Sequence, residues 1–300
     1  MKNPTVSFII PTYKRSPGIL LRAIRSAMNQ SFSVAEIIVV NDDPQGRQLI
    51  EESLSGIEKV KLLHNDENKG ACFSRNRGAY ESVGNYTAFL DDDDEWHPEK
   101  IEKQVARLDD GIVLVYCSGV GVAGGKETGR LSFIHELSND PYVGLLRSNC
   151  VGGCSFPLIS KDAFFRCGGF DTAFPSSQDH DLWIRLLETG TVAFVDEPLV
   201  RYSFSDDSIT KDIDKRIRGY RLMLKKHKRL SRQYPNSSNH YCVDLVLLCL
   251  NSHRQVDAVK VFFYSFVFFP WNIGLAILLI RAWITHVLVK VDARKNANAR

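Results

Sequence analysis

Five consecutive acidic side chains are the first feature of this sequence that could do chemistry. They are Asp91 to Glu95, in the segment AFLDDDDEWHP at 88–98, directly behind a short apolar run. Neighbouring carboxylates repel one another, so the run is either a solvated acidic turn or a site for a cation. Mg²⁺ and Mn²⁺ bind to one or two carboxylates together with substrate phosphates. Asp91 and Asp93, two residues apart, therefore form a candidate D-x-D site for a metal ion that holds a diphosphate.

Three further aspartates could act beside such a site. Asp179, in QDHDLW, lies near the start of a predicted helix, where it could favour the helix dipole or act as a general base towards an attacking hydroxyl. Asp181 is a second candidate, better suited to a structural or acceptor-binding role. Asp42 ends the run EIIVVND and is either a turn residue or a carboxylate that accepts from a base and a ribose. His180 lacks the spacing of a metal ligand, so no metal is assigned to it.

Alternating strands and helices in the first half must position these acids. Strands are expected at 6–12, 35–42, 60–66 and 86–92, and helices at 18–31, 45–56 and 71–83. Continuous apolar strands separated by helices indicate a mostly parallel sheet covered on both faces, which binds ligands beyond the carboxyl ends of its strands. Pro11 and Thr12, residues 41–43 and residues 91–94 fall at three such ends. We expect them to form one site.

The pattern loosens in the second half. We expect two strands joined by a glycine-rich turn at 112–133, a short helix after Ser160, a helix within 176–190, and a strand pair or a strand plus loop at 192–204. The composition changes after Ser205, with ten Lys or Arg against two Asp between 211 and 232, followed by a polar break at 235–239. These changes predict three parts, at 1–112, 113–205 and 206–300.

Composition excludes few classes of protein. The 300 residues are 44% hydrophobic and 24% charged, which is typical of a globular protein of one large or two smaller domains. A net charge of +3 is too weak to indicate nucleic acid as a partner. Seven scattered cysteines without a C-x-x-C favour a reducing compartment, and the start of the chain lacks the pattern of a signal peptide, so we expect a cytosolic N-terminal end.

A twenty-residue run without charge, at 261–280, bears on membrane association. Its length could span a bilayer, but Pro270, Asn272 and Gly274 interrupt its centre. A helical pair in the membrane interface, or one docked on the protein, fits as well. The basic stretch 211–232 either contacts an anionic membrane surface or is a solvated helix face.

Six segments, in this order, resemble the family 2 glycosyltransferases, which are inverting enzymes with a GT-A fold. They are SFIIPTYKR, EIIVVNDD, ENKGACFSRNRGA, TAFLDDDDEWHP, GGFD and SSQDHDLWIRLLETG, within about residues 5 to 204. The resemblance implies an α/β fold with a Rossmann-like, mostly parallel central sheet. The residues that follow would form a helical extension that associates with the membrane.

The resemblance also implies roles for single residues. The donor-binding residues would be Pro11, Thr12, Asp42, Arg75 and Asp92. Asp42 would contact the base, usually uracil, while the acid run by itself leaves Asp92 and Asp94 undecided. Asp91 and Asp93 would be the D-x-D acids that hold Mn²⁺ or Mg²⁺, with Asp93 the direct ligand. Asp179 would be the catalytic base.

Two departures from the family pattern concern the site. Gln178 stands where the family has Glu before the base, and Asp43-Pro44 stand where it often has Gly-Ser. No Q-x-x-R-W follows Asp179, which argues against the processive synthases and favours one sugar added per binding event.

The implied function is transfer of a sugar from a nucleoside-diphosphate donor, UDP by expectation, to an acceptor hydroxyl. The acceptor would be a glycan or a polyprenyl-diphosphate-linked sugar, in the assembly of lipopolysaccharide O-antigen, capsule or exopolysaccharide. We expect the protein at the cytoplasmic face of the inner membrane. Two alternatives stay open: a phosphatase of the haloacid dehalogenase type, which expects Thr or Val in place of Glu95 and its motif on the first strand, and a non-catalytic membrane-associated protein that binds nucleotide sugars.

Overall fold

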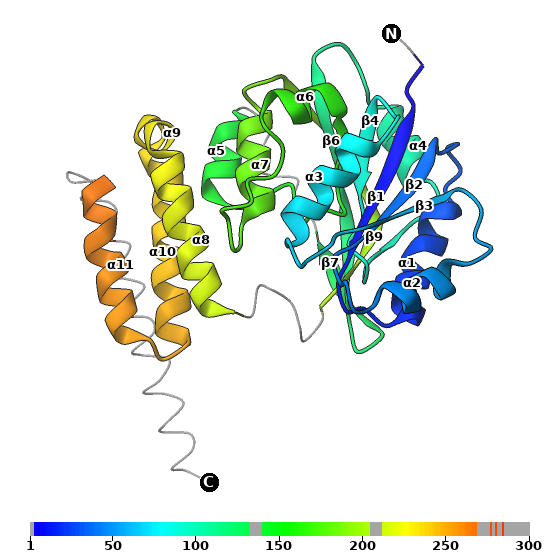
Figure 1. Cartoon of the computed structure of the whole chain (residues 1–300). Helices are drawn as coiled ribbons and strands as arrows, with labels where there is room; N and C mark the ends of the chain where they lie inside the picture. The colour runs from blue at the N-terminus through cyan, green and yellow to red at the C-terminus, as the bar shows by residue number, and fades with distance from the viewer. Residues whose placement is uncertain are drawn as a thin grey trace. The chain divides into compact units, whose positions relative to one another are not determined.

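The computed structural model describes residues 3–131, 140–204 and 212–268, together with residues 277, 280 and 284 (Figure 1). The chain divides into two units. The first unit comprises Met1–Pro141, Cys150–Ala173 and Gln178–Ser208, and the second comprises Tyr142–Asn149, Phe174–Ser177 and Ile209–Arg300. The acids singled out from the sequence all lie in the first unit.

A mixed sheet is the scaffold of the first unit. Its strands among the described residues are β1 (Val6–Thr12), β2 (Glu36–Asn41), β3 (Val60–His64), β4 (Tyr86–Phe89), β5 (Glu95–Trp96), β6 (Ile112–Ala123), β7 (Lys126–Leu131), β8 (Leu158–Ser160) and β9 (Thr191–Ser203). They follow the order β3-β2-β1-β4-β8-β6-β9-β5, and β7 pairs with β6. Residues 1–112, expected to bind the nucleotide sugar, and residues 113–205, expected to bind the acceptor and carry the catalytic base, contribute strands to this same sheet. These separate roles stay a prediction.

The pairing directions determine where the strands end. β1 is parallel to both β2 and β4, and β2 is parallel to β3, so the carboxyl ends of these four strands share one edge. β8 is antiparallel to both β4 and β6, whereas β6 and β9 are parallel. The first half thus forms the parallel sheet that its apolar runs predict.

The final strand differs from the expected strand pair or strand plus loop. β9 is one strand of 13 residues, whose register against β6 shifts where Val195 opposite Cys117 is followed by Pro198 opposite Ser118. The extra residues form a bulge there. A bulge accommodates Pro198, which has no amide hydrogen to donate to the sheet.

Helices cover the two faces of the sheet in the first unit. They are α1 (Pro17–Met28), α2 (Arg47–Leu54), α3 (Ala71–Glu81), α4 (Lys100–Val105), α6 (Lys161–Arg166) and α7 (Gln178–Leu186). Pro17 begins α1, and its buried residues Leu20, Ala23, Ile24 and Ala27 have helical spacing, so one apolar stripe faces the sheet.

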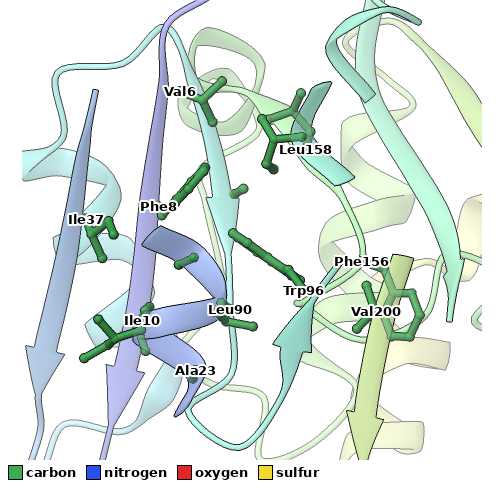
Figure 2. Packing of buried hydrophobic residues seen from close by; sticks show 14 of the residues in the cluster. Val6, Phe8, Ile10, Ala23, Ile37, Leu90, Trp96, Phe156, Leu158 and Val200 are labelled. Carbon is green, nitrogen blue, oxygen red and sulfur yellow. The ribbon is translucent and has the colours of Figure 1, made fainter. Parts of the chain in front are cut away.

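Figure 2 shows the core that α1 completes, with Phe8 and Ile10 of β1 beside Ala23 and Leu90. Trp96 packs edge-on against Phe8, with ring centroids 5.0 Å apart. Full burial of each such large side chain stabilises the fold by about 1.5–3 kcal/mol. This core fixes the segment that leaves β4, which is the acid run.

The opposite face of the sheet packs against α3. A Cβ on Gly78 would lie 2.5 Å from Cγ2 of Ile9, so only glycine allows this close approach of helix and sheet. Phe89 continues this face and contacts Phe164 and Phe170, with ring centroids 5.6 and 5.2 Å apart. Phe170 in turn lies 6.5 Å from Trp183 of α7, so aromatic packing connects β4 to α7.

The second unit is helical. Its helices among the described residues are α5 (Pro141–Arg147), α8 (Ile213–Lys226), α9 (Lys228–Gln233), α10 (Pro235–Asn251) and α11 (Gln255–Phe268). The polar break predicted at 235–239 is wrong, because Pro235 occupies the first turn of α10, where a missing amide hydrogen costs nothing. Cys242, Leu245 and Cys249 of α10 are fully buried in the core of this unit.

The uncharged run at 261–280 lies largely outside the described residues. α11 ends at Phe268, and only residues 277 and 280 of the remainder are described. Within the described part of the chain, none of the helices combines the length and apolar character that a membrane span requires.

Candidate active site

The shared edge of the parallel strands brings the three predicted clusters into contact. Thr12, the last residue of β1, donates from Oγ1 to Oδ2 of Asp92 at 2.7 Å, although 80 residues separate them. The backbone amide of Asp42, just beyond β2, donates to the carbonyl of Thr12 at 2.9 Å. The ends of β1, β2 and β4 therefore meet, as the strand pattern predicts.

The acid run separates into buried and accessible members. Asp92 and Asp94 are 7% and 1% exposed, whereas the side chains of Asp91 and Asp93 are 28% and 17% exposed. The carboxylate of Asp94 accepts from Ser155 Oγ at 2.6 Å and from the backbone amide of Ser203 at 2.8 Å. Among the four aspartates, Asp91 and Asp93 are therefore the two best exposed to a ligand.

Burial has an electrostatic cost in this run. It raises the pKa of Asp92 to about 6, against the lowering effect of Arg15 and of the hydrogen bond from Thr12. Burial also raises the pKa of Asp94 well above its usual range, and the charge of Asp91 raises it further. A cation at this edge would offset the repulsion among the carboxylates.

Two arginines compensate part of this negative charge. Arg75 of α3 is buried and donates from Nη2 to Oδ1 of Asp91 at 2.5 Å, with its guanidinium 5.4 Å from the ring centroid of Phe170. Its Nε and Nη1 are buried without a hydrogen-bond partner among the described residues, which suits an anion that supplies acceptors. Arg15 binds Asp92 and Asp93, at 2.9 and 3.2 Å.

The donor set at this edge fits a divalent cation that brings further ligands with its substrate. Asp91 and Asp93 supply hard carboxylate oxygens, the ligands that Mg²⁺ and Mn²⁺ prefer. No group of three or more His, Cys, Asp or Glu that could hold a metal occurs among the described residues. An ion here would therefore be completed by phosphate oxygens and water.

Asp42 already has several hydrogen-bond donors within the chain. Its Oδ1 accepts from Asn65 Nδ2 at 2.6 Å and from the amide of Lys69 at 2.9 Å, and its Oδ2 accepts from the amide of Gly70 at 2.7 Å. Gly70 precedes α3 with φ of 84°, a conformation that favours glycine. Asp42 thus holds the loop that begins α3, a role the sequence did not indicate, while contact with a base stays a prediction.

Asp179 lies in the first turn of α7 and shares the electrostatic surroundings of the acid run. Its Oδ1 accepts from the amide of His180 at 2.8 Å. Burial raises the pKa of Tyr202, and the charges of Asp94, Asp91, Asp179 and Asp93 raise it further. Coulomb interactions weaken with distance, so Tyr202 lies within electrostatic range of Asp179 and of the D-x-D acids.

Asp181 forms an ion pair inside the protein. It is fully buried and accepts from Nε and Nη2 of Arg185 at 2.9 and 2.6 Å. Nη1 of Arg185 donates to the carbonyl of Cys167 at 2.6 Å, which joins α7 to the end of α6. Of the two roles considered for Asp181, the structural one agrees with these contacts. His180 is buried as well.

The GGFD segment connects α3 to the chain that leads to α7. Asn76 donates from Nδ2 to the carbonyl of Phe170 and accepts from the amide of Phe170, both at 2.8 Å. Gly169 has φ of 67°, and a Cβ there would lie 2.7 Å from Oδ1 of Asn76. The asparagine therefore positions Phe170, ahead of the helix that carries Asp179.

Two site residues escaped the sequence reasoning. Ser155 accepts from the amide of Asp91 at 3.0 Å and donates to Asp94, and Arg15 bridges Asp92 and Asp93. Neither has a local signal, because each partner lies more than 60 residues away in the chain.

Comparisons with known proteins agree with this architecture. The model of the family named Glycosyl transferase family 2 matches residues 7–163. An uncharacterized glycosyltransferase of Haemophilus influenzae is 33% identical over 66% of this chain and 68% of its own. WcaA of Escherichia coli, named for colanic acid biosynthesis, is 28% identical over 77% of this chain and 86% of its own. TuaG of Bacillus subtilis, named for teichuronic acid biosynthesis, is 28% identical over 70% and 82%.

Solved structures share the fold at low sequence identity. The mannosyltransferase PcManGT of Pyrobaculum calidifontis, in complex with GDP-Man and Mn²⁺, has a TM-score of 0.62 at 13% identity, over 95% of this chain and 81% of its own. Staphylococcus aureus TarS 1-349, in complex with UDP-GlcNAc, has a TM-score of 0.60 at 14% identity, over 85% and 89%. With a family model that covers more than half of its length, the chain belongs to glycosyltransferase family 2, and the protein is a glycosyltransferase of the GT-A type of fold.

Proposed function

We propose that this glycosyltransferase is a metal-dependent, inverting enzyme that transfers one sugar per binding event from a nucleoside-diphosphate sugar to an acceptor hydroxyl. The observation that carries the proposal is the pair of accessible aspartates, Asp91 and Asp93, at the shared edge of the parallel strands beside buried Arg75. Asp179 lies within electrostatic range of Tyr202, as these two aspartates do. The exposed D-x-D pair suits a metal-bound diphosphate, and Asp179 suits a base. The family model ends at residue 163, so the role of Asp179 rests on this geometry and on the sequence pattern around it.

The residues divide the reaction between them. Arg75, with two buried N–H groups, would donate to a donor phosphate while it holds Asp91. Asp91 and Asp93 would hold the divalent cation, which, when bound, neutralises charge that grows on the leaving diphosphate. Asp179 would take the proton of the acceptor hydroxyl as its oxygen bonds to the anomeric carbon and the bond to the diphosphate breaks. Attack from the face opposite the diphosphate inverts the anomeric configuration.

The relatives and structural neighbours support the substrate class. TarS was solved with UDP-GlcNAc and PcManGT with GDP-Man and Mn²⁺, so both sugar nucleotides bind on this fold. WcaA and TuaG are named for the biosynthesis of two polysaccharides. We propose a UDP-sugar donor and a glycan or polyprenyl-diphosphate-linked acceptor in the assembly of a surface polysaccharide: O-antigen, capsule or exopolysaccharide.

The phosphatase alternative loses its basis once the family is known. A phosphatase of that type carries its nucleophilic aspartate after the first strand, whereas Asp91 follows β4 and forms an ion pair with buried Arg75. The non-catalytic alternative would leave the three aspartates without a task. Activity therefore decides between the proposal and that alternative.

Substitution of Asp179 by Asn tests the base. Removal of a general base costs about 10²- to 10⁴-fold in rate, so transfer should fall by that factor. UDP binding in the presence of Mn²⁺, measured by titration calorimetry, should stay within about twofold of wild type, because a base on the acceptor side adds little to donor affinity. Asp162→Asn, at an exposed position of α6, is the matched control and should leave both properties unchanged. Near-normal transfer by Asp179→Asn would refute the assignment.

We also propose that the helical second unit contacts an anionic membrane surface from the cytoplasmic side. Arg218, Lys225 and Arg229 of α8 and α9 are exposed. On α11, Val259 and Phe263 are 54% and 66% exposed and one helical turn apart. Basic and apolar side chains together suit the headgroup region of a bilayer.

A further inference from the structure

Arg15 contacts the acid run, and the mechanism above does not use its placement. It lies in the loop between β1 and α1, where Lys14 has φ of 51°, a left-handed conformation uncommon for residues other than glycine. Ser16 follows as the N-cap of α1. The loop therefore holds Arg15 between the start of α1 and a residue in an uncommon backbone conformation, and such conformations cluster at functional sites.

The guanidinium of Arg15 connects a buried member of the acid run with an accessible one. Its Nε donates to Oδ1 of Asp92 at 2.9 Å, and its Nη2 donates to Oδ2 of Asp93 at 3.2 Å. Asp92 also accepts from Thr12, so two donors fix the orientation of its carboxylate. The contact to Asp93 is the longer of the two, and it engages the carboxylate that the D-x-D pattern assigns to the metal.

The backbone of the acid run does not depend on Arg15. The carbonyl of Asp93 accepts from Arg22 Nη2 at 3.0 Å and from Ser203 Oγ at 2.6 Å. The side chain of Asp93 can therefore turn from one cation to another while the loop stays in place. Loss of Arg15 should therefore change the charge at the acid run while the backbone of the run stays in place.

We infer that Arg15 is a positioning residue that exchanges the carboxylate of Asp93 for the diphosphate of the donor, an inference that rests on the proposed function. Without donor, Arg15 occupies Asp93 and its positive charge opposes a divalent cation. With donor, Asp93 turns to the cation, while Arg15 stays on Asp92 through Nε and donates from Nη2 to a phosphate oxygen. The metal ion and the nucleotide then strengthen each other's binding. The diphosphate gives Arg15 an acceptor in place of Asp93, and the release of Asp93 gives the cation a ligand.

The substitution Arg15→Gln gives this inference a signature of opposite signs. Mn²⁺ binding to the full-length protein without nucleotide should become tighter, by about fivefold or more, because the competing positive charge is gone. UDP binding in the presence of saturating Mn²⁺ should become weaker, by about tenfold or more, because a charge-assisted hydrogen bond to phosphate is lost. Electron paramagnetic resonance of free Mn²⁺ measures the first property and titration calorimetry the second.

A control and a second variant make the test decisive. Arg25→Gln removes the same charge from an exposed position of α1 and should shift neither affinity. Arg15→Met, an apolar side chain of similar length, should reproduce both shifts and serves as the second variant if Arg15→Gln does not fold. If the Arg15 variants weaken Mn²⁺ binding and UDP binding together, or change neither, the inference is refuted while the proposed function stands. If the wild-type protein binds no UDP with Mn²⁺, the proposed function fails, and the exchange with it.

Discussion

The bridge from Asn76 to Phe170 offers the sharpest test of how the structure positions the proposed base, Asp179. Asn76 makes two hydrogen bonds to one buried residue, each at 2.8 Å. The substitution Asn76→Ala removes both and leaves the amide and carbonyl of Phe170, which is 2% exposed, without these partners. An unpaired buried backbone group costs about 1–3 kcal/mol. The free energy of unfolding should therefore fall by about 2–6 kcal/mol for the two groups.

Urea denaturation followed by tryptophan fluorescence measures this loss, because Trp96 and Trp183 lie buried in the first unit. Asn68→Ala is the matched control. Asn68 is exposed and accepts from the amide of Gly70 at 3.2 Å, so its removal should cost no more than about 0.5 kcal/mol. Under conditions where the Asn76→Ala protein is folded, transfer should fall more than UDP binding, since the bridge supports the segment ahead of α7. A loss of stability as small as that of the control would refute the reasoning.

Two further predictions concern the acid run and the second unit. Burial raises the pKa of Asp92 from 3.8 to about 6, so folding takes up a proton between these values. The stabilisation from this group is full below about pH 4 and is lost as pH rises through 6, a change of about 3 kcal/mol. Urea denaturation of Asp92→Asn at pH 4 and 7 should show a smaller decrease than wild type, and equal decreases would contradict the assignment. Sedimentation with vesicles should show binding to anionic but not neutral lipid. The double substitution Val259→Ser and Phe263→Ser should weaken binding to anionic vesicles. Tyr80→Ser, at an exposed apolar residue of the first unit, should leave this binding unchanged. If the wild-type protein does not sediment with anionic vesicles at low salt, this proposal is excluded.

The first half of the fold was predictable because its signals are local. The apolar run at 6–12 coincides with β1, and the helix expected at 71–83 is α3, Ala71–Glu81. Continuous apolar strands that alternate with helices permit few arrangements other than a parallel sheet. Strand direction then places the ends of β1, β2 and β4 on one edge, so the meeting of the three predicted clusters followed as well.

The second half was less predictable because pairing decides it. The register shift opposite Ser118 of β6 makes β9 one bulged strand. No local pattern within 192–204 indicates that β6 is its pairing partner. From sequence alone, Pro235 indicates either a break or the start of a helix. The packing of α10 in the core of the second unit stabilises the helix that Pro235 begins.

The sequence by itself predicted the family of this protein, which the family model confirms, and the residues that we propose for its chemistry, the D-x-D acids at a strand end and the later Asp179. Only the tertiary structure decided how the acids differ from one another. Asp92 and Asp94 are buried against Thr12 and Ser155, while Asp91 and Asp93 remain accessible. The reason is physical: residue type and local periodicity specify what a side chain can do, but burial and hydrogen-bond partners come from segments 60 or more residues away, which only the folded chain brings together.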